Sequence, residues 1–128
     1  MLNETFVKPM NQSGEKFSRQ SRLLTAEDYR RVFSKPIKSS DGFFTVLAVK
    51  KHHEQARLGL AISKKNTRLA VDRNRLKRLI RESFRKNQSH LDGLDLVVMA
   101  RQQTSQQENH KLFRSLQRHW IKLQKSCN

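Results

Sequence analysis

Apolar residues recur along this chain with two periods, one typical of strands and one typical of helices. Within residues 56–65, bulky Leu and Ile at positions 58, 60 and 62 alternate with small residues at 59, 61 and 63, which predicts a strand with one bulky and one small face. Residues 43–51 and 94–101 are rich in aromatic and β-branched residues and also predict strands. A weaker strand over 36–40 precedes an Asp41-Gly42 turn.

Three segments have helical spacing. The first begins after Thr25, a predicted N-cap with Asp28 three residues on, and ends near Lys35 because Pro36 follows. The second spans roughly 69–87, and the third runs from about 105 to 125 behind a Ser105–Glu108 capping pattern. The order predicts an α+β fold, an αβββαβα sandwich in which helices pack on one small mixed sheet. We expect a single domain over 21–128 and a flexible or extended basic arm over 1–20.

The second helix has two chemically distinct sides. At about 100° per residue, Leu76, Leu79, Ile80 and Phe84 gather on one side with Ser83, so this side should lie on the sheet. The opposite side collects polar and basic residues, namely Asn74, Lys77, Arg78, Arg81 and Arg85. A helix that only had to stay soluble would place acids four residues from its bases, but Lys77 and Arg81 have none there. This pattern favours a binding surface for an anion.

The overall charge favours the same interpretation. Lys and Arg total 27 against 11 Asp and Glu, a formal net charge of +16. Such charge destabilises a small fold by self-repulsion unless a polyanion neutralises it, and nucleic acid is the first such partner to consider. No segment has the length and apolarity of a membrane span, and the one cysteine is Cys127, so we expect a cytoplasmic chain without a disulfide. The few, dispersed acids predict neither catalytic residues nor a metal site made by the protein alone.

Long stretches of the chain resemble the protein component of bacterial ribonuclease P. The resemblance rests on SKKNTRLAVDRNRLKRLIRESFR over 63–85, FSRQSRLLTAEDYRRVF over 17–33, RLGLAISKK over 57–65 and LDLVVMAR over 94–101. It implies an accessory subunit that works with a catalytic RNA, whose Mg²⁺-dependent hydrolysis removes the 5′ leader of precursor tRNA. It also implies the fold of the second domain of ribosomal protein S5, with a left-handed βαβ crossover.

The resemblance also implies site residues. Those expected to lie against the catalytic RNA are Arg73, Asn74, Arg75, Lys77, Arg78 and Arg81. Those expected at a cleft for the single-stranded leader are Tyr29, Phe33, Phe44 and Val46, with Lys64 and Lys65 at its rim. Periodicity alone favours core packing for Tyr29 and Phe33. Val46 stands where some members carry a tyrosine, and Phe43 or Phe44 is the expected substitute.

Three other functions share some of these features. A ribosomal-type structural RNA-binding protein would have the same charge and fold class without a leader cleft. A DNA-binding regulator would need the basic helix exposed on most sides, whereas its apolar residues require burial, so no DNA partner is expected. A helix lying on a membrane surface is the third alternative, and we expect no membrane partner because strands match its apolar side.

Overall fold

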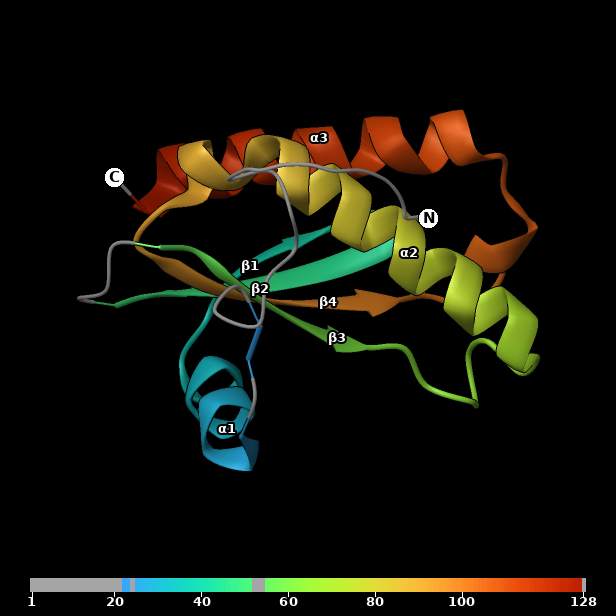
Figure 1. Ribbon diagram of the computed structural model, residues 1–128, viewed down its shortest axis with the longest axis horizontal. Helices are drawn as coiled ribbons and strands as arrows, with labels where there is room; N and C mark the ends of the chain where they lie inside the picture. The colour runs from blue at the N-terminus through green and yellow to red at the C-terminus, as the bar shows by residue number, and fades with distance from the viewer. Residues whose placement is uncertain (1–21, 24, 52–54, 128) are drawn as a thin grey trace, which may run out of the picture.

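The computed structural model describes residues 22–23, 25–51 and 55–127 (Figure 1). Its elements are α1 (Ala26–Ser34), β1 (Ile37–Ser40), β2 (Phe44–Lys50), β3 (Arg57–Ala61), α2 (Ala70–Asn87), β4 (Leu94–Ala100) and α3 (Asn109–Cys127), with short 3₁₀ helices η2 (Gln88–Leu91) and η3 (Thr104–Gln106). The predicted αβββαβα order is confirmed, including the short strand β1. The predicted arm over 1–20 lies outside the described residues.

The four strands form one mixed sheet in the order β1-β2-β4-β3. β2 is antiparallel to both β1 and β4, and its register with β4 pairs Val46 with Val98 and Leu47 with Val97. β3 is parallel to β4, and the chain between them passes through α2. Because side chains alternate along a strand, this register decides which residues face which helical layer.

Helices cover both faces of the sheet, with α2 and α3 on one face and α1 on the other (Figure 1). The core under α2 and α3 includes Leu58, Leu96 and Val98 from the strands. It is completed by helix side chains that are almost fully buried, namely Leu76, Ile80, Phe84, Leu112, Leu116, Trp120 and Leu123. The predicted apolar side of the basic helix therefore does lie on the sheet.

A smaller cluster lies beneath α1. Val32 is fully buried against Leu47 of β2 and Val97 of β4, and Leu23 joins them from the preceding segment. α1 begins with the predicted capping box, in which the Thr25 hydroxyl accepts from the Asp28 amide and the Asp28 carboxylate accepts from the Thr25 amide. The sequence thus specifies where this helix starts, and burial of Val32 holds it on the sheet.

The turn between β1 and β2 is tied to α3. The Asp41 carboxylate accepts hydrogen bonds from the amides of Phe43 and Phe44 and from the Ser115 hydroxyl, and these lower the pKa of Asp41 to about 2 although burial alone would raise it. Its second oxygen also lies 3.2 Å from Nε2 of His119, whose Nδ1 is 2.6 Å from the Ser39 hydroxyl. Burial lowers the pKa of His119, and the charge of Asp41 opposes that shift.

The start of α3 differs from the sequence prediction. Helix α3 begins at Asn109, where the Glu108 carbonyl accepts from the Leu112 amide, whereas Ser105 lies within η3. The reason is the positive φ of Gln103, 71°, which turns the chain, together with tertiary hydrogen bonds that hold the carbonyls of Ser105 and Gln107. A local capping pattern cannot report such contacts.

Candidate nucleic-acid interface

The outer side of α2 presents cations to solvent. Asn74, Arg78 and Arg81 are exposed and Lys77 is half-buried, while the opposite side of the helix lies on the sheet. The acid within this helix that could neutralise the surface, Glu82, pairs instead with Arg85 at 2.7 Å and Lys86 at 3.6 Å. The predicted separation of apolar and basic sides is confirmed, and the ion pairs of Glu82 lie toward the C-terminal end of the helix.

The two arginines that flank Asn74 are engaged within the protein. Arg73 donates to the carbonyls of Thr67 and Arg68 at 3.0 and 2.7 Å, and so holds the loop before α2. Arg75 donates to the carbonyls of Ser105 and Gln107 at 2.8 and 2.5 Å and twice to the side-chain oxygen of Asn109. Both therefore position the loops beside the N-terminus of α2, a role that the sequence analysis did not assign to them.

The basic side of α2 extends around the β3 edge of the sheet. The guanidinium of Arg81 lies near the charge of Arg22 and the hydroxyl of Tyr29, a residue of α1 on the other face. Burial and the charge of Arg22 lower the pKa of Arg81. A single nucleic-acid chain lying along this edge would therefore meet both helices.

Tyr29 fills the space that the small face of β3 provides. A Cβ on Gly59 would lie 2.7 Å from Cε1 of Tyr29, so only glycine fits beneath the ring. The Tyr29 hydroxyl accepts a hydrogen bond from the Leu60 amide at 3.2 Å. On the same side of α1, Phe33 is 46% exposed. Tyr29 is thus largely a packing residue, whereas Phe33 offers a free aromatic face.

Two residues predicted at the leader cleft lie on the wrong face of the sheet. Phe44 and Val46 are both fully buried and belong to the core beneath α2 and α3. The reason is the alternation of β2, which turns Thr45, Leu47 and Val49 toward α1 instead. The prediction for Phe44 and Val46 was therefore wrong.

The part of the sheet face that α1 leaves uncovered is flanked by cations. Thr45 of β2 and Met99 of β4 form a cross-strand pair there, and both are half-buried. Lys64 and Lys65 are exposed in the loop after β3, which is fixed by a hydrogen bond from the Asn66 side chain to the Ala100 carbonyl. The rim position expected of the two lysines stays a prediction.

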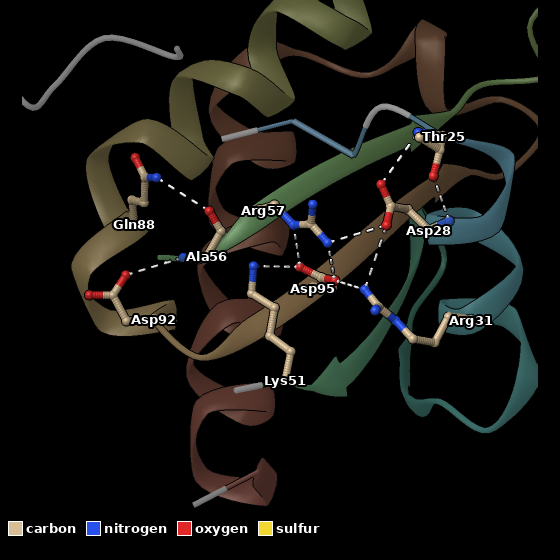
Figure 2. A network of polar contacts seen from close by, with 9 residues as sticks. All are labelled: Thr25, Asp28, Arg31, Lys51, Ala56, Arg57, Gln88, Asp92 and Asp95. Carbon is tan, nitrogen blue, oxygen red and sulfur yellow. Dashed lines mark hydrogen bonds and ion pairs between the residues drawn. The ribbon is translucent and has the colours of Figure 1, made fainter. Parts of the chain in front are cut away.

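A buried carboxylate joins α1 to the sheet (Figure 2). Asp95, fully buried in β4, accepts from Arg57 of β3 at 2.9 and 3.0 Å, lies 2.8 Å from Nζ of Lys51, and pairs with Arg31 of α1. Arg57 also reaches Asp28 of α1 at 3.4 Å. Burial would raise the pKa of Asp95, but Arg57 and Lys51 lower it, so the carboxylate is charged and fixes the position of α1.

Comparison with known proteins identifies the family. The ribonuclease P family model matches residues 17–124. This chain belongs to the ribonuclease P protein family. The chain is 44% identical over 121 residues to the ribonuclease P protein component of Methylococcus capsulatus, covering 94% of each chain. It is 46% identical over 111 residues to that of Thioalkalivibrio sulfidiphilus, covering 87% of this chain and 92% of the relative.

Solved ribonuclease P proteins share the fold. The ribonuclease P protein of Staphylococcus aureus matches with a TM-score of 0.74 and 32% identity, covering 84% of this chain and 98% of that one. That of Thermotoga maritima matches with a TM-score of 0.70 and 28% identity, covering 84% and 97%. The α+β fold with its mixed sheet is thus that of the ribonuclease P proteins.

The ribonuclease P relationship raises the question of Mg²⁺. No group of three or more His, Cys, Asp or Glu side chains suited to a metal occurs in the described ranges. On α2, Glu82 is paired with two cations, and Asp72 is the one other acid of that helix. Within the described ranges, no helix is long and apolar enough to cross a membrane.

Sequence reasoning missed the residues that position α1 in this ribonuclease P protein. Asp95 did carry a signal, because a carboxylate within the apolar run 94–100 must find a buried partner. Its partners Arg57, Lys51 and Arg31 come from three separate segments, so only the fold reveals them.

Proposed function

We propose that this chain is the accessory protein subunit of a cytoplasmic ribonuclease P. It binds the catalytic RNA and the 5′ leader of precursor tRNA and assists endonucleolytic removal of the leader, which yields the mature tRNA 5′ end. The protein contributes no catalytic residue, and the RNA supplies the hydrolytic chemistry and holds most of the Mg²⁺. The observation that carries the proposal is the exposed cationic side of α2 in a chain of the ribonuclease P family.

The basic side of α2 is the proposed contact to the catalytic RNA. Arg78 and Arg81 are exposed, and a planar guanidinium binds phosphate through two parallel hydrogen bonds. Lys77 adds a point charge, and Asn74 offers a neutral donor and acceptor to a base edge or a ribose hydroxyl. Arg73 and Arg75 act mainly through the loops that they hold, which keep the N-terminal end of this surface in place.

The uncovered sheet face beside α1 is the proposed site for the leader. Single strands bind by stacking bases on aromatic rings beside positive charge, which contributes about 1–3 kcal/mol per base. Phe33 is the aromatic side chain of α1 that is free to stack, since Tyr29 is packed over Gly59. Lys64 and Lys65, both exposed in the loop after β3, are the cations proposed to neutralise the leader phosphates.

A reconstitution experiment tests the two surfaces. The chain is assembled with a ribonuclease P RNA, and binding and cleavage are measured for precursor tRNAs with a long and with a minimal leader. Phe33→Ala should weaken binding of the long-leader substrate by about 5- to 150-fold and leave the minimal-leader substrate nearly unchanged. Ile37→Ala removes a similarly exposed apolar side chain from another surface and should change neither.

Two results would contradict the proposal. If the chain bound the RNA but never stimulated cleavage, a structural RNA-binding role of the ribosomal type would fit better. If Phe33→Ala weakened both substrates equally, the leader site would not lie at Phe33.

A further inference from the structure

Helix α3 carries a second row of cations. Its exposed basic residues are Lys111, Arg114, Arg118, Lys122 and Lys125. At about 100° per residue they fall within an arc of about 80°, on the side away from the buried residues. We call these five residues the α3 basic row. The contacts proposed above for α2 and α1 do not involve the α3 basic row.

The α3 basic row is poorly suited to a merely solvated surface. The helix from Asn109 to Cys127 contains no Asp or Glu, so none of its bases has an acidic partner within the helix. Arg114, Arg118 and Lys122 instead follow one another at four-residue intervals, where like charges destabilise a helix by a few tenths of a kcal/mol per pair. A bound polyanion would convert this repulsion into attraction.

Within the part of the chain that the structure describes, one member of the row forms an ion pair with an acid outside the helix, and this acid is already engaged in hydrogen bonds. Arg118 lies 3.6 Å from Asp41, whose carboxylate accepts hydrogen bonds from Ser115 and two backbone amides. The contact leaves Arg118 largely exposed, with 58% of its side-chain area accessible. Asp41 therefore offsets only a small part of the charge along this helix.

The α3 basic row and the basic side of α2 point in different directions. Trp120 of α3 donates to Ser83 of α2, so this side of α3 faces α2. His119 and Arg118 lie toward the β1–β2 turn instead, next to Ser39 and Asp41. The basic side of α2 extends toward β3 at the opposite edge of the sheet, where Arg81 lies near Arg22. The two surfaces therefore lie on different sides of the molecule.

We propose that the α3 basic row binds the phosphate backbone of an RNA helix, apart from the segment that α2 contacts. From Lys111 to Lys125 the row extends about 21 Å, long enough to contact several successive phosphates of one strand. Long side chains at regular intervals suit a regular backbone and read no base sequence. The identity of the RNA, a second helical segment of the ribonuclease P RNA, rests on the proposed function, but the phosphate-binding chemistry does not.

A lysine footprint tests the proposal directly. The full chain is acetylated alone and in complex with ribonuclease P RNA, and each lysine is quantified by mass spectrometry. Lys111, Lys122 and Lys125 should be protected several-fold in the complex, whereas Lys35 at the end of α1 and Lys38 of β1, exposed cations elsewhere, should react as in the free protein. Equal reactivity of the three α3 lysines in both states would overturn the proposal.

A pair of charge-matched variants provides the second test. Lys111→Gln/Arg114→Gln/Lys122→Gln should lower RNA affinity at least tenfold and reduce the slope of log affinity against log salt by about 3. The control Arg30→Gln/Lys35→Gln/Lys38→Gln removes the same charge from α1 and β1 and should have a much smaller effect on both. Equal effects would mean that only net charge matters and would overturn the inference. Protection of the row by anionic vesicles but not by RNA would overturn it as well.

The footprint also separates this inference from the proposed function. Lys77 reports on α2 in the same experiment. Protection of Lys77 without protection of the α3 lysines would leave the proposed function standing and sink this inference. Protection of the α3 lysines without protection of Lys77 would support this inference and contradict the proposed contact between α2 and the RNA.

Discussion

The ring of Tyr29 lies directly over Gly59, on the face of β3 that carries small residues. A Cβ at position 59 would come within 2.9 Å of three atoms of this ring. The contact joins the first helix to the edge strand, and the hydroxyl of the same ring accepts a hydrogen bond from the next amide of that strand, Leu60. A glycine in the middle of a strand is thus explained by the aromatic residue above it.

Replacing this glycine should displace the tyrosine. Gly59→Ala would force the ring away from β3 and break the bond to Leu60, at a cost of about 1–3 kcal/mol in the free energy of unfolding. Urea denaturation measures this loss. Gly42→Ala is the matched control, because a Cβ at Gly42 would meet no atom within 4 Å. Equal stability of the two variants would show that the ring does not need the glycine.

The buried carboxylate of Asp95 should be essential for holding α1. Asp95→Asn leaves Lys51, Arg57 and Arg31 without their shared anion, and breaking such a buried network costs about 3–5 kcal/mol. Thermal denaturation should show a large drop, with little change for Glu27→Gln, an exposed acid on the first turn of α1. An unaltered melting temperature in Asp95→Asn would contradict the role assigned to this residue.

The same carboxylate should make the fold sensitive to acid. Its pKa is lowered in the folded protein, so its contribution is complete above the ordinary value of 3.8 and is lost as the pH falls through the lower folded value. Above pH 3.8, titration of Asp95 should contribute little to the change of the free energy of unfolding with pH, which urea denaturation at several pH values measures.

Arg75 should contribute mainly to the stability of the fold, whereas Arg78 should contribute mainly to RNA binding. Arg75→Ala removes two hydrogen bonds to the loop that precedes α3 and two to Asn109, the first residue of α3, and should destabilise the fold by about 1–3 kcal/mol. Arg78→Ala removes an exposed side chain and should leave stability unchanged while weakening RNA binding. Denaturation and RNA-binding titrations on the same preparations separate the two effects. If Arg75→Ala were as stable as the parent protein, its hydrogen bonds would not stabilise the fold, and the role expected of Arg75 would be RNA binding alone.

Protonation of His119 should lower the free energy of unfolding in mildly acidic solution. Burial lowers its folded pKa below 6.5, opposed by Asp41, and the nearby charges of Arg118 and Lys122 lower it further. Its contribution is therefore complete above about pH 6.5 and is lost as the pH falls through the folded value. Urea denaturation at about pH 7.5 and about pH 5.5 should show a smaller loss in His119→Gln than in the parent. His110→Gln, at an exposed histidine of the same helix, should behave like the parent.

Periodicity was sufficient to predict the element order because each helix and strand has an independent local signal. The capping box at Thr25 and the apolar side of α2 are properties of neighbouring residues, and both are confirmed. The start of α3 was placed too early because Arg75, some 30 residues away in sequence, holds the preceding loop. Local patterns do not contain such contacts.

The candidate site was harder to predict from the sequence than the fold. Phe44 and Val46 were assigned to the leader site, but alternation along β2 alone does not say which set of side chains faces α1. That choice depends on pairing with β4 and on the positions of all three helices. The exposed side of α2 was easier to predict because its charge and its apolar residues lie on opposite sides of one helix.

Two backbone groups on the outer edge of β3 already form hydrogen bonds within the protein. The Leu58 carbonyl accepts from the amide of Leu23, and the Leu60 amide donates to the Tyr29 hydroxyl. A strand with a free edge can recruit a strand from another molecule and start aggregation. Because Leu23 and Tyr29 occupy these two groups, the β3 edge is less available for pairing with a strand of another molecule.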